Sequence, residues 1–206
     1  MKMPQSYNIE EKIYMVKLVK ETIKKVIHNE NIELPSDCPQ KLKEKGACFV
    51  TIEKFVEGKK HLRGCIGTLF AYRPLIEDLI ENSINAAFYD PRFPPLSSEE
   101  LKNIEVEISI LTNPKMLKFS GYKELLEKLN PPQDGVILSK SGKRATFLPS
   151  VWEHFKTDTG YYKEGFLTEL CLKAGLMPSA WREEGCEIQI YHSIIIKESE
   201  LRKYIK

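Results

Sequence analysis

Apolar residues recur every three or four positions in three long stretches, at 9–27, 75–88 and 166–174. This spacing is typical of a helix that buries one face. Asn8 precedes the first stretch and Glu11 follows three residues later, which is the pattern of a capping box. The second stretch stops before a proline, and the third is followed by a glycine. Shorter helical signals follow Ser97, Tyr122 and Pro149.

Alternating apolar and polar residues predict strands between these helices. Hairpins are indicated at about 48–69 and 134–148, a single strand at 104–110 and a last long strand at 186–196. Helices that alternate with hairpins favour an α+β fold, with a largely antiparallel sheet that could close like a barrel and is flanked by helices. A doubly wound sheet is disfavoured because no glycine-rich phosphate loop joins a strand to a helix.

The order helix, hairpin, helix, strand occurs twice, at about 9–111 and 121–196. The two halves show no similarity at residue level, so a duplicated topology and a coincidence both stay open. With 206 residues, the chain allows one domain of two lobes, and the proline-rich stretch 113–133 is the candidate seam between them.

Composition narrows the possible partners. Lys and Arg number 31 against 29 Asp and Glu, a net charge of +2, so net charge gives no basis for nucleic-acid binding. No long apolar run or signal-peptide core is present, which predicts a cytoplasmic protein without a membrane segment. Five cysteines without a CxxC pair indicate neither a disulfide scaffold nor a metal site, and no cofactor is identified.

The segment LRGCIG places Cys65 between two glycines, with Arg63 two residues earlier. Gly64 and Gly67 leave the backbone open to close approach by a ligand or by another part of the chain. On a regular strand Arg63 and Cys65 share a face, and a guanidinium beside a thiol lowers its pKa. Burial acts in the opposite direction and would make Cys65 a core residue.

The segment DPRFPPL is stiffened by three prolines, so Asp90 and Arg92 project from it at low entropic cost. One interpretation is a preorganised anion site. The alternative is that Asp90 brackets a turn and Arg92 pairs with a carboxylate such as Glu107. Only six arginines occur among 31 basic residues, and Arg144 lies in a third motif segment, so a planar fork for carboxylate or phosphate is indicated at these positions.

A histidine near Cys65 would act as its base. His154, in the segment TFLPSVWEHF, is a weak candidate, as is His192. His61 is disfavoured because about 13 Å of strand separates it from Cys65. Trp152 in the same segment is expected in the core.

These motifs, LRGCIGTL and NAAFYDPRFPPLSSEEL in the first half and DGVILSKSGKRATFLPSVWEHF with FLTELCLKAGL in the second, resemble the AMMECR family of archaeal and bacterial type. The resemblance spans roughly residues 10–195. It implies an α+β fold of a larger and a smaller lobe, with RGCIG lining a cleft between them. It supplies no established reaction. Family context implies a functional link to Memo-like and radical SAM proteins.

Two classes of function follow. In the first, the protein is an enzyme or enzyme-pathway component that acts on a small anionic substrate, with Cys65 as nucleophile or redox thiol and Arg63, Arg92 and Asp90 orienting the substrate. In the second, it is a non-catalytic module that binds a phosphate-bearing ligand, nucleic acid or a partner protein.

Overall fold

The computed structural model describes residues 6–204, which form two compact units. The first unit contains the chain up to Thr112 and again from Ile194 onward. The second contains Asn113–Ser193. The chain therefore passes from one unit to the other twice, and each unit is described by itself below.

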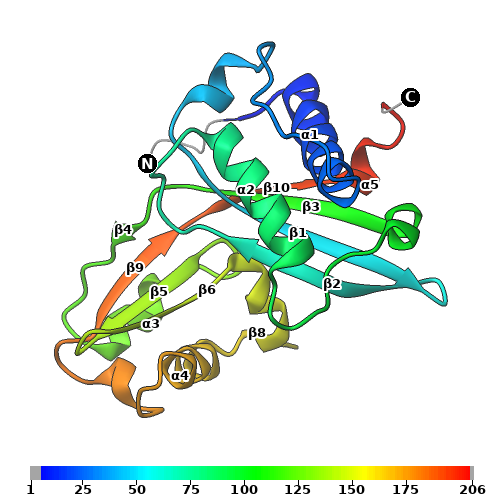
Figure 1. Cartoon of the computed structure of the whole chain (residues 1–206). Coiled ribbons are helices and arrows are strands. Elements are labelled where there is room, and N and C mark those ends of the chain that lie inside the picture. The colour runs from blue at the N-terminus through cyan, green and yellow to red at the C-terminus, as the bar shows by residue number, and fades with distance from the viewer. Residues whose placement is uncertain (1–5, 205–206) are drawn as a thin grey trace. The chain divides into compact units, whose positions relative to one another are not determined.

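The first unit consists of one four-stranded sheet and its helices (Figure 1). Its elements are α1 (Ile9–Ile27), η1 (Gln40–Lys43), β1 (Ala47–Val56), β2 (Lys59–Gly67), α2 (Leu75–Phe88), η2 (Ser98–Lys102), β3 (Ile104–Leu111), β10 (Ser193–Lys197) and α5 (Glu198–Leu201). The strand order is β10-β3-β1-β2, and β1 runs antiparallel to both β2 and β3. Strand β2 thus lies at one edge of the sheet.

The predicted helix signals of this unit are confirmed. The Asn8 side chain accepts the backbone N–H of Glu11 at 2.8 Å, and the Glu11 carboxylate accepts the N–H of Asn8 at 2.8 Å. Helix α2 ends at Phe88, two residues before Asp90, because the residue before a proline is driven out of helical geometry. The position of Asp90 directly after α2 brings the proline-rich segment to β2.

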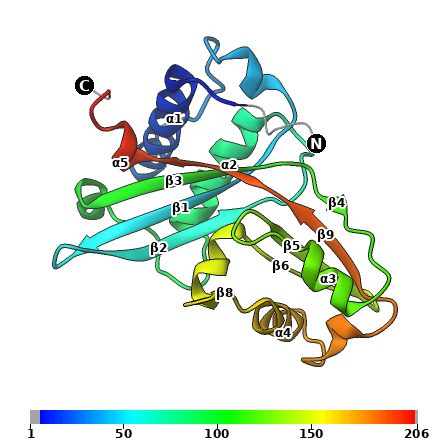
Figure 2. The same cartoon turned by 180° about the vertical axis from the view of Figure 1, so that it is seen from behind.

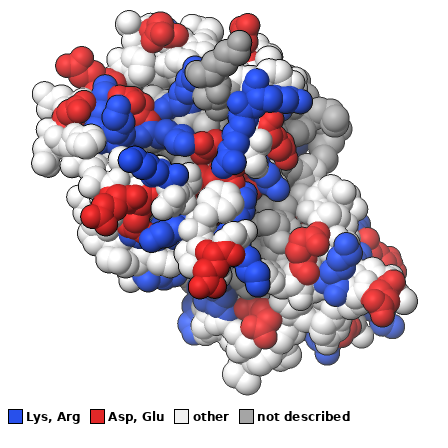
Figure 3. Space-filling model, turned by 90° about the vertical axis from the view of Figure 1, so that its right-hand side faces the viewer, with Lys and Arg blue, Asp and Glu red and all other residues white. Residues whose placement is uncertain are grey.

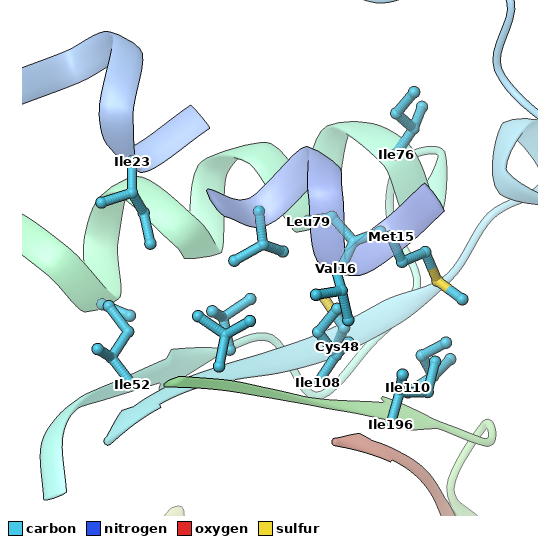
Figure 4. Packing of buried hydrophobic residues seen from close by; sticks show 14 of the residues in the cluster. Met15, Val16, Ile23, Cys48, Ile52, Ile76, Leu79, Ile108, Ile110 and Ile196 are labelled. Atoms are coloured by element: carbon cyan, nitrogen blue, oxygen red, sulfur yellow. The ribbon is translucent and has the colours of Figure 1, made fainter. Parts of the chain in front are cut away.

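One face of this sheet carries the core. Helices α1 and α2 cover it in both views (Figures 1 and 2). Figure 4 shows Val16 of α1 and Leu79 of α2 over Cys48 and Ile52 of β1 and Ile108 of β3. All five are fully buried. Because side chains alternate across a strand, Thr51 and Glu107 point to the opposite face.

The second unit has its own sheets and its own core. Its elements are β4 (Lys115–Met116), α3 (Tyr122–Lys128), β5 (Gly135–Lys140), β6 (Lys143–Phe147), η3 (Pro149–Phe155), β7 (Lys156–Thr157), β8 (Gly160–Tyr161), α4 (Lys163–Lys173), η4 (Ala180–Arg182) and β9 (Glu187–Tyr191). Strands β4-β9-β5-β6 form a four-stranded sheet, and β7 and β8 form a separate hairpin.

The core of the second unit is centred on aromatic rings. Trp152 of η3 stacks on Phe166 of α4 with ring centroids 3.5 Å apart, and both residues are fully buried. The indole N–H of Trp152 donates to the carbonyl of Asp134 at 2.7 Å, which satisfies the polar atom that burial would otherwise leave unpaired. The prediction that Trp152 is a core residue is confirmed.

The α+β fold and the antiparallel pairings predicted from the sequence are confirmed, but neither four-stranded sheet closes into a barrel. Each sheet has two distinct edge strands. The duplication of topology is present in the strand order, because β3-β1-β2 in the first unit matches β9-β5-β6 in the second. In each case the strand after the second helix pairs with the first strand of the hairpin.

The prediction of a single last strand over 186–196 is wrong. The stretch divides at His192 into β9 and β10, which belong to different sheets. The chain leaves the second unit at this point, and the His192 ring lies 3.0 Å from the Asp134 carboxylate of that unit. An alternating pattern shows which residues are extended but not which strand they pair with.

No helix in the described part of the chain has the length and apolar character needed to span a membrane.

Candidate functional site

Cys65 lies on the edge strand β2, directly opposite Thr51 of β1. Its sulfur is 3.1 Å from the Thr51 hydroxyl oxygen, and either atom can be the donor. Because Thr51 points away from helices α1 and α2, the thiol is on the face of the sheet opposite the core. Cys65 is half-buried, whereas the other four cysteines are buried. It is therefore the cysteine that a small molecule can reach most readily.

The outer edge of β2 is closed at Cys65 by side chains of the DPRFPPL segment. The Asp90 carboxylate accepts the backbone N–H of Cys65 at 2.8 Å, and the Arg92 guanidinium donates to the Cys65 carbonyl at 3.2 Å. These two bonds take the place of a neighbouring strand at an otherwise open edge. Asp90 and Arg92 therefore fix the position of the residue that carries the thiol.

Asp90 and Arg92 are also bound to each other. Arg92 donates from Nε to one carboxylate oxygen of Asp90 at 2.9 Å and from Nη2 to the other at 2.7 Å. Asp90 is 2 % exposed, while the Arg92 side chain is 52 % exposed. The charge-assisted bonds from Arg92 hold the pKa of the Asp90 carboxyl far below its ordinary value, and the same pairing raises the pKa of Arg92. Both groups are ionised at neutral pH.

Arg92 retains donors that the protein does not use. A guanidinium has five N–H groups, and the bonds to Asp90 and to the Cys65 carbonyl occupy Nε and Nη2. The described residues supply no acceptor for Nη1. Because the Arg92 side chain is half exposed and its Nη2 group is bound to the Cys65 carbonyl, an anion could bind the guanidinium next to Cys65.

The expected effect of Arg63 on the Cys65 thiol is wrong. Burial raises the pKa of Cys65, the hydrogen bond with Thr51 and the charge of Arg92 lower it, and Asp90 and Glu107 raise it further. Arg63 is not among these causes. At neutral pH Cys65 is a protonated thiol rather than a thiolate.

A β-bulge explains the different orientation of Arg63. The pairing of β1 with β2 is shifted between Ile52 and Glu53, so Arg63 is left without a partner in the register. Its guanidinium binds Glu100 of η2 in a bidentate pair, at 2.9 and 3.0 Å, and donates to the carbonyl of Pro95 at 3.3 Å. Arg63 is 7 % exposed, so it does not lie open to an anionic substrate beside Cys65 as expected from a shared strand face.

Glu100, the partner of Arg63, has a strongly lowered pKa. The bonds from Arg63 lower the pKa of Glu100 to about 2. Glu100 also closes the capping box of η2 on Ser97. The ring of Phe93 lies near both guanidinium groups, with its centroid 5.9 Å from Cζ of Arg63 and 5.5 Å from Cζ of Arg92. Arg63 therefore anchors the loop that carries Asp90 and Arg92.

Three polar side chains form a row across the sheet next to this loop. Cys65 of β2 pairs with Thr51 of β1, and Thr51 pairs with Glu107 of β3. Burial raises the pKa of Glu107, and the nearby Glu53 raises it further. Lys197 is the main opposing charge, 3.9 Å away. The alternative prediction for Asp90 and Arg92 is confirmed in part: Asp90 brackets a turn, because its carboxylate accepts the backbone N–H of Arg92 at 3.1 Å, and Arg92 pairs with a carboxylate. That carboxylate is Asp90 and not Glu107.

The glycines of LRGCIG are explained by packing. A Cβ at Gly64 would lie 2.0 Å from the carbonyl oxygen of Ala86 in α2, and one at Gly67 would lie 2.2 Å from the Phe49 ring. At Gly64 the segment that approaches closely is therefore helix α2. A role for Gly64 or Gly67 in binding a ligand stays a prediction.

The remaining candidates lie in the second unit or away from the thiol. His154 is exposed in η3, and His192 pairs with the buried Asp134. His61 of β2 is exposed and lies opposite Lys54. Arg144 of β6 donates to the Ser139 hydroxyl at 2.9 Å. No motif in the sequence points to Thr51, because only the pairing of β1 with β2 places it beside Cys65.

No group of three or more His, Cys, Asp or Glu side chains within residues 6–204 is arranged to hold a metal ion.

The fold and the site define a two-unit α+β protein with a half-buried thiol on a sheet edge, bounded by an arginine–aspartate pair. The family model AMMECR1 matches residues 16–196. The chain belongs to the AMMECR1 family.

Archaeal relatives match over nearly the whole chain. Protein MJ0810 of Methanocaldococcus jannaschii is 39% identical over 194 residues, which cover 94% of this chain and 93% of the relative. A protein of Thermofilum pendens is 36% identical over 92% of this chain and 91% of its own length. The crystal structure of the uncharacterized protein PH0010 from Pyrococcus horikoshii is similar, with a TM-score of 0.80, 34% identity and 90% of each chain covered.

Proposed function

We propose that this protein is an enzyme or enzyme-pathway component that takes a small anionic substrate at the Cys65 edge of the first sheet. Arg92 binds the anion and the Cys65 thiol is the reacting group. The observation that carries this proposal is a half-exposed guanidinium that is already fixed to the Cys65 backbone and has no acceptor for Nη1 among the described residues. A preorganised guanidinium loses little entropy when it binds a carboxylate or phosphate.

The raised pKa of Cys65 sets the conditions under which the thiol reacts. A protonated thiol is a poor nucleophile, so the proton must leave when the substrate binds or as the pH rises. Arg92 favours the thiolate through its charge, and the buried Asp90 carboxylate opposes that effect. Reactivity therefore depends on the substrate as well as on the protein.

Two alkylating reagents test whether the site selects anions. Iodoacetate and iodoacetamide react in the same way: the thiolate sulfur forms a bond to carbon, iodide leaves and the thiol proton passes to solvent. Only the former is an anion. We expect the rate with iodoacetate divided by the rate with iodoacetamide to be larger at Cys65 than for a small model thiol. Peptide mass spectrometry measures both rates.

The Arg92→Gln variant should bring that ratio down to the model value, and the Arg182→Gln variant, in the second unit, should leave it unchanged. Equal ratios in the wild type and in Arg92→Gln would refute anion selection. If Cys65 stays unreactive up to pH 10 and Cys65→Ser retains anion binding, the thiol has no reacting role. The alternative, a non-catalytic binding module, would then be favoured.

The face shown in Figure 3 is poorly suited to nucleic acid. Lys and Arg lie among Asp and Glu on the face shown in Figure 3, so that face has no continuous positive surface for a phosphate backbone. The small-substrate proposal needs only the local donors of Arg92.

A further inference from the structure

We infer that the substrate of the Cys65 site is dipolar, with an anionic end on Arg92 and a cationic or N–H-donating end at Glu107. This inference rests on the proposed function and adds the second end of the substrate. The row Glu107, Thr51 and Cys65 crosses three strands on the face opposite the core, and Arg92 borders its outer end.

Arg92 and Glu107, at the two ends of the row, differ in how well an opposite charge of the protein compensates each of them. Asp90 binds Arg92 through two short bonds, so the guanidinium needs only an acceptor for its free N–H groups. The one ion pair of Glu107 within residues 6–204 is the contact with Lys197 at 3.9 Å. Lys197 is 45% exposed, so water screens this attraction. Glu107 is the acceptor with the poorest partner in the row.

The charged groups around Glu107 compensate its negative charge only weakly. Glu53 faces it from β1 and Glu200 from α5, and both oppose its ionisation. Lys60 of β2 favours ionisation but forms ion pairs with Glu53 and Glu105. A ligand cation placed here would stabilise the Glu107 carboxylate and would also remove a negative charge that opposes ionisation of Cys65.

This last effect couples binding to reactivity. Glu107, Asp90 and Arg92 are the charged groups that act on the thiol, and Thr51 is its hydrogen-bond partner. When a cation neutralises Glu107, the pKa of Cys65 falls toward its ordinary value and the thiolate fraction rises. The cationic end of the substrate thus favours the thiolate, whereas its anionic end on Arg92 opposes it by cancelling the charge that lowers the pKa of Cys65.

The length of the row from Cys65 to Glu107 limits the length of the substrate. Two inter-strand spacings separate Cys65 from Glu107, about 10 Å between the backbones. A short ω-amino acid can bridge that distance, with its carboxylate on Arg92 and its ammonium group at Glu107. The Thr51 hydroxyl and the thiol then lie beside the middle of the ligand.

The experiment measures protection of Cys65 against iodoacetamide by matched probes. 6-Aminohexanoate and shorter and longer ω-amino acids are compared with hexanoate and hexylamine. For each protein variant, the protection by a compound is measured as the concentration that halves the rate of Cys65 alkylation. We expect the best ω-amino acid to protect at about fivefold lower concentration than the matching carboxylate, since one partly screened ion pair contributes up to about 1 kcal/mol.

The Glu107→Gln variant should abolish this advantage without changing protection by hexanoate. Glu127→Gln, on α3 of the second unit, is the matched control and should preserve the advantage. If hexanoate protects as well as every ω-amino acid, the dipolar substrate is refuted while the anion site stands. If no carboxylate protects, or hexylamine protects best, both the dipolar substrate and the proposed function fail.

Discussion

The two arginine–carboxylate pairs beside LRGCIG have similar geometry and different surroundings. Arg63 and Arg92 each use Nε and Nη2 to bind a carboxylate, Glu100 and Asp90 respectively, and each also donates to a backbone carbonyl. The Arg63 side chain is 9 % exposed, whereas the Arg92 side chain is 52 % exposed.

This difference decides what each arginine can do. The Nη1 group of Arg63 is buried and has no acceptor among the described residues, so solvent and substrate do not reach it. The Arg92 side chain is half exposed, and the described residues supply no acceptor for its Nη1 group. The same side chain in the same kind of pair thus stabilises the loop in one case and offers a ligand site in the other.

Removing either arginine should separate the two pairs most clearly through the free energy of unfolding. Arg63→Ala should lower the free energy of unfolding by about 3 kcal/mol, because it leaves the nearly buried Glu100 carboxylate with a weaker set of partners. Arg92→Ala should cost less, about 2 kcal/mol, because the buried Asp90 carboxylate keeps the backbone N–H groups of Cys65 and Arg92 and water can take the place of the exposed guanidinium. Denaturant unfolding of both variants measures this order, and a larger loss in Arg92→Ala would contradict the assignment of roles.

The glycine between Arg63 and Cys65 should matter nearly as much. Gly64→Ala places a methyl group 2.0 Å from the Ala86 carbonyl oxygen, which is part of the backbone of α2 and cannot rotate away. We expect a loss of about 2 kcal/mol by thermal or denaturant unfolding.

Gly121→Ala is the matched control for this substitution. No atom beyond its chain neighbours lies within 4 Å of the added methyl group there, and the backbone of Gly121 is extended. Its stability should change by less than about 0.5 kcal/mol. Equal effects at the two glycines would mean that close packing of α2 does not require Gly64.

The smallest of the three effects is the pH dependence of the buried pair. The folded pKa of Glu100 is about 2, below its ordinary value of 4.5, so its contribution to stability is present above pH 4.5 and is lost as the pH falls toward 2. The contribution is on the order of 1–2 kcal/mol after allowance for partial exposure.

Glu100→Gln should reduce the slope of unfolding free energy against pH between about pH 5 and pH 2. Asp90 contributes a slope of the same sign, because its folded pKa is also depressed, and that slope should remain in Glu100→Gln. An unchanged slope in Glu100→Gln would show that Arg63 does not hold Glu100 as the geometry indicates.

Much of the fold is predictable from local pattern. The capping box at Asn8, the end of α2 before Asp90 and the hairpin of β5 and β6 are set by residues a few positions apart. The closed sheet and the single last strand were wrong because closure and partner choice depend on strands distant in the sequence.

The candidate site was predictable only in part. Cys65, Asp90 and Arg92 are identified by their motifs, and the structure brings these three together. Thr51 and Glu107 join them only through the register of three strands. The β-bulge that separates Arg63 from Cys65 has no clear signal in the sequence, because it depends on how two strands align.

The sequence by itself determined which segments are helical or extended, which residues carry the chemistry and which family the motifs resemble, because these depend on local spacing and on residue type. Only the tertiary structure decided that Arg63 is buried on Glu100, that Arg92 is exposed beside Cys65 and that burial raises the pKa of the thiol. Exposure and charge compensation are sums over neighbours from distant parts of the chain, and folding alone brings those neighbours together.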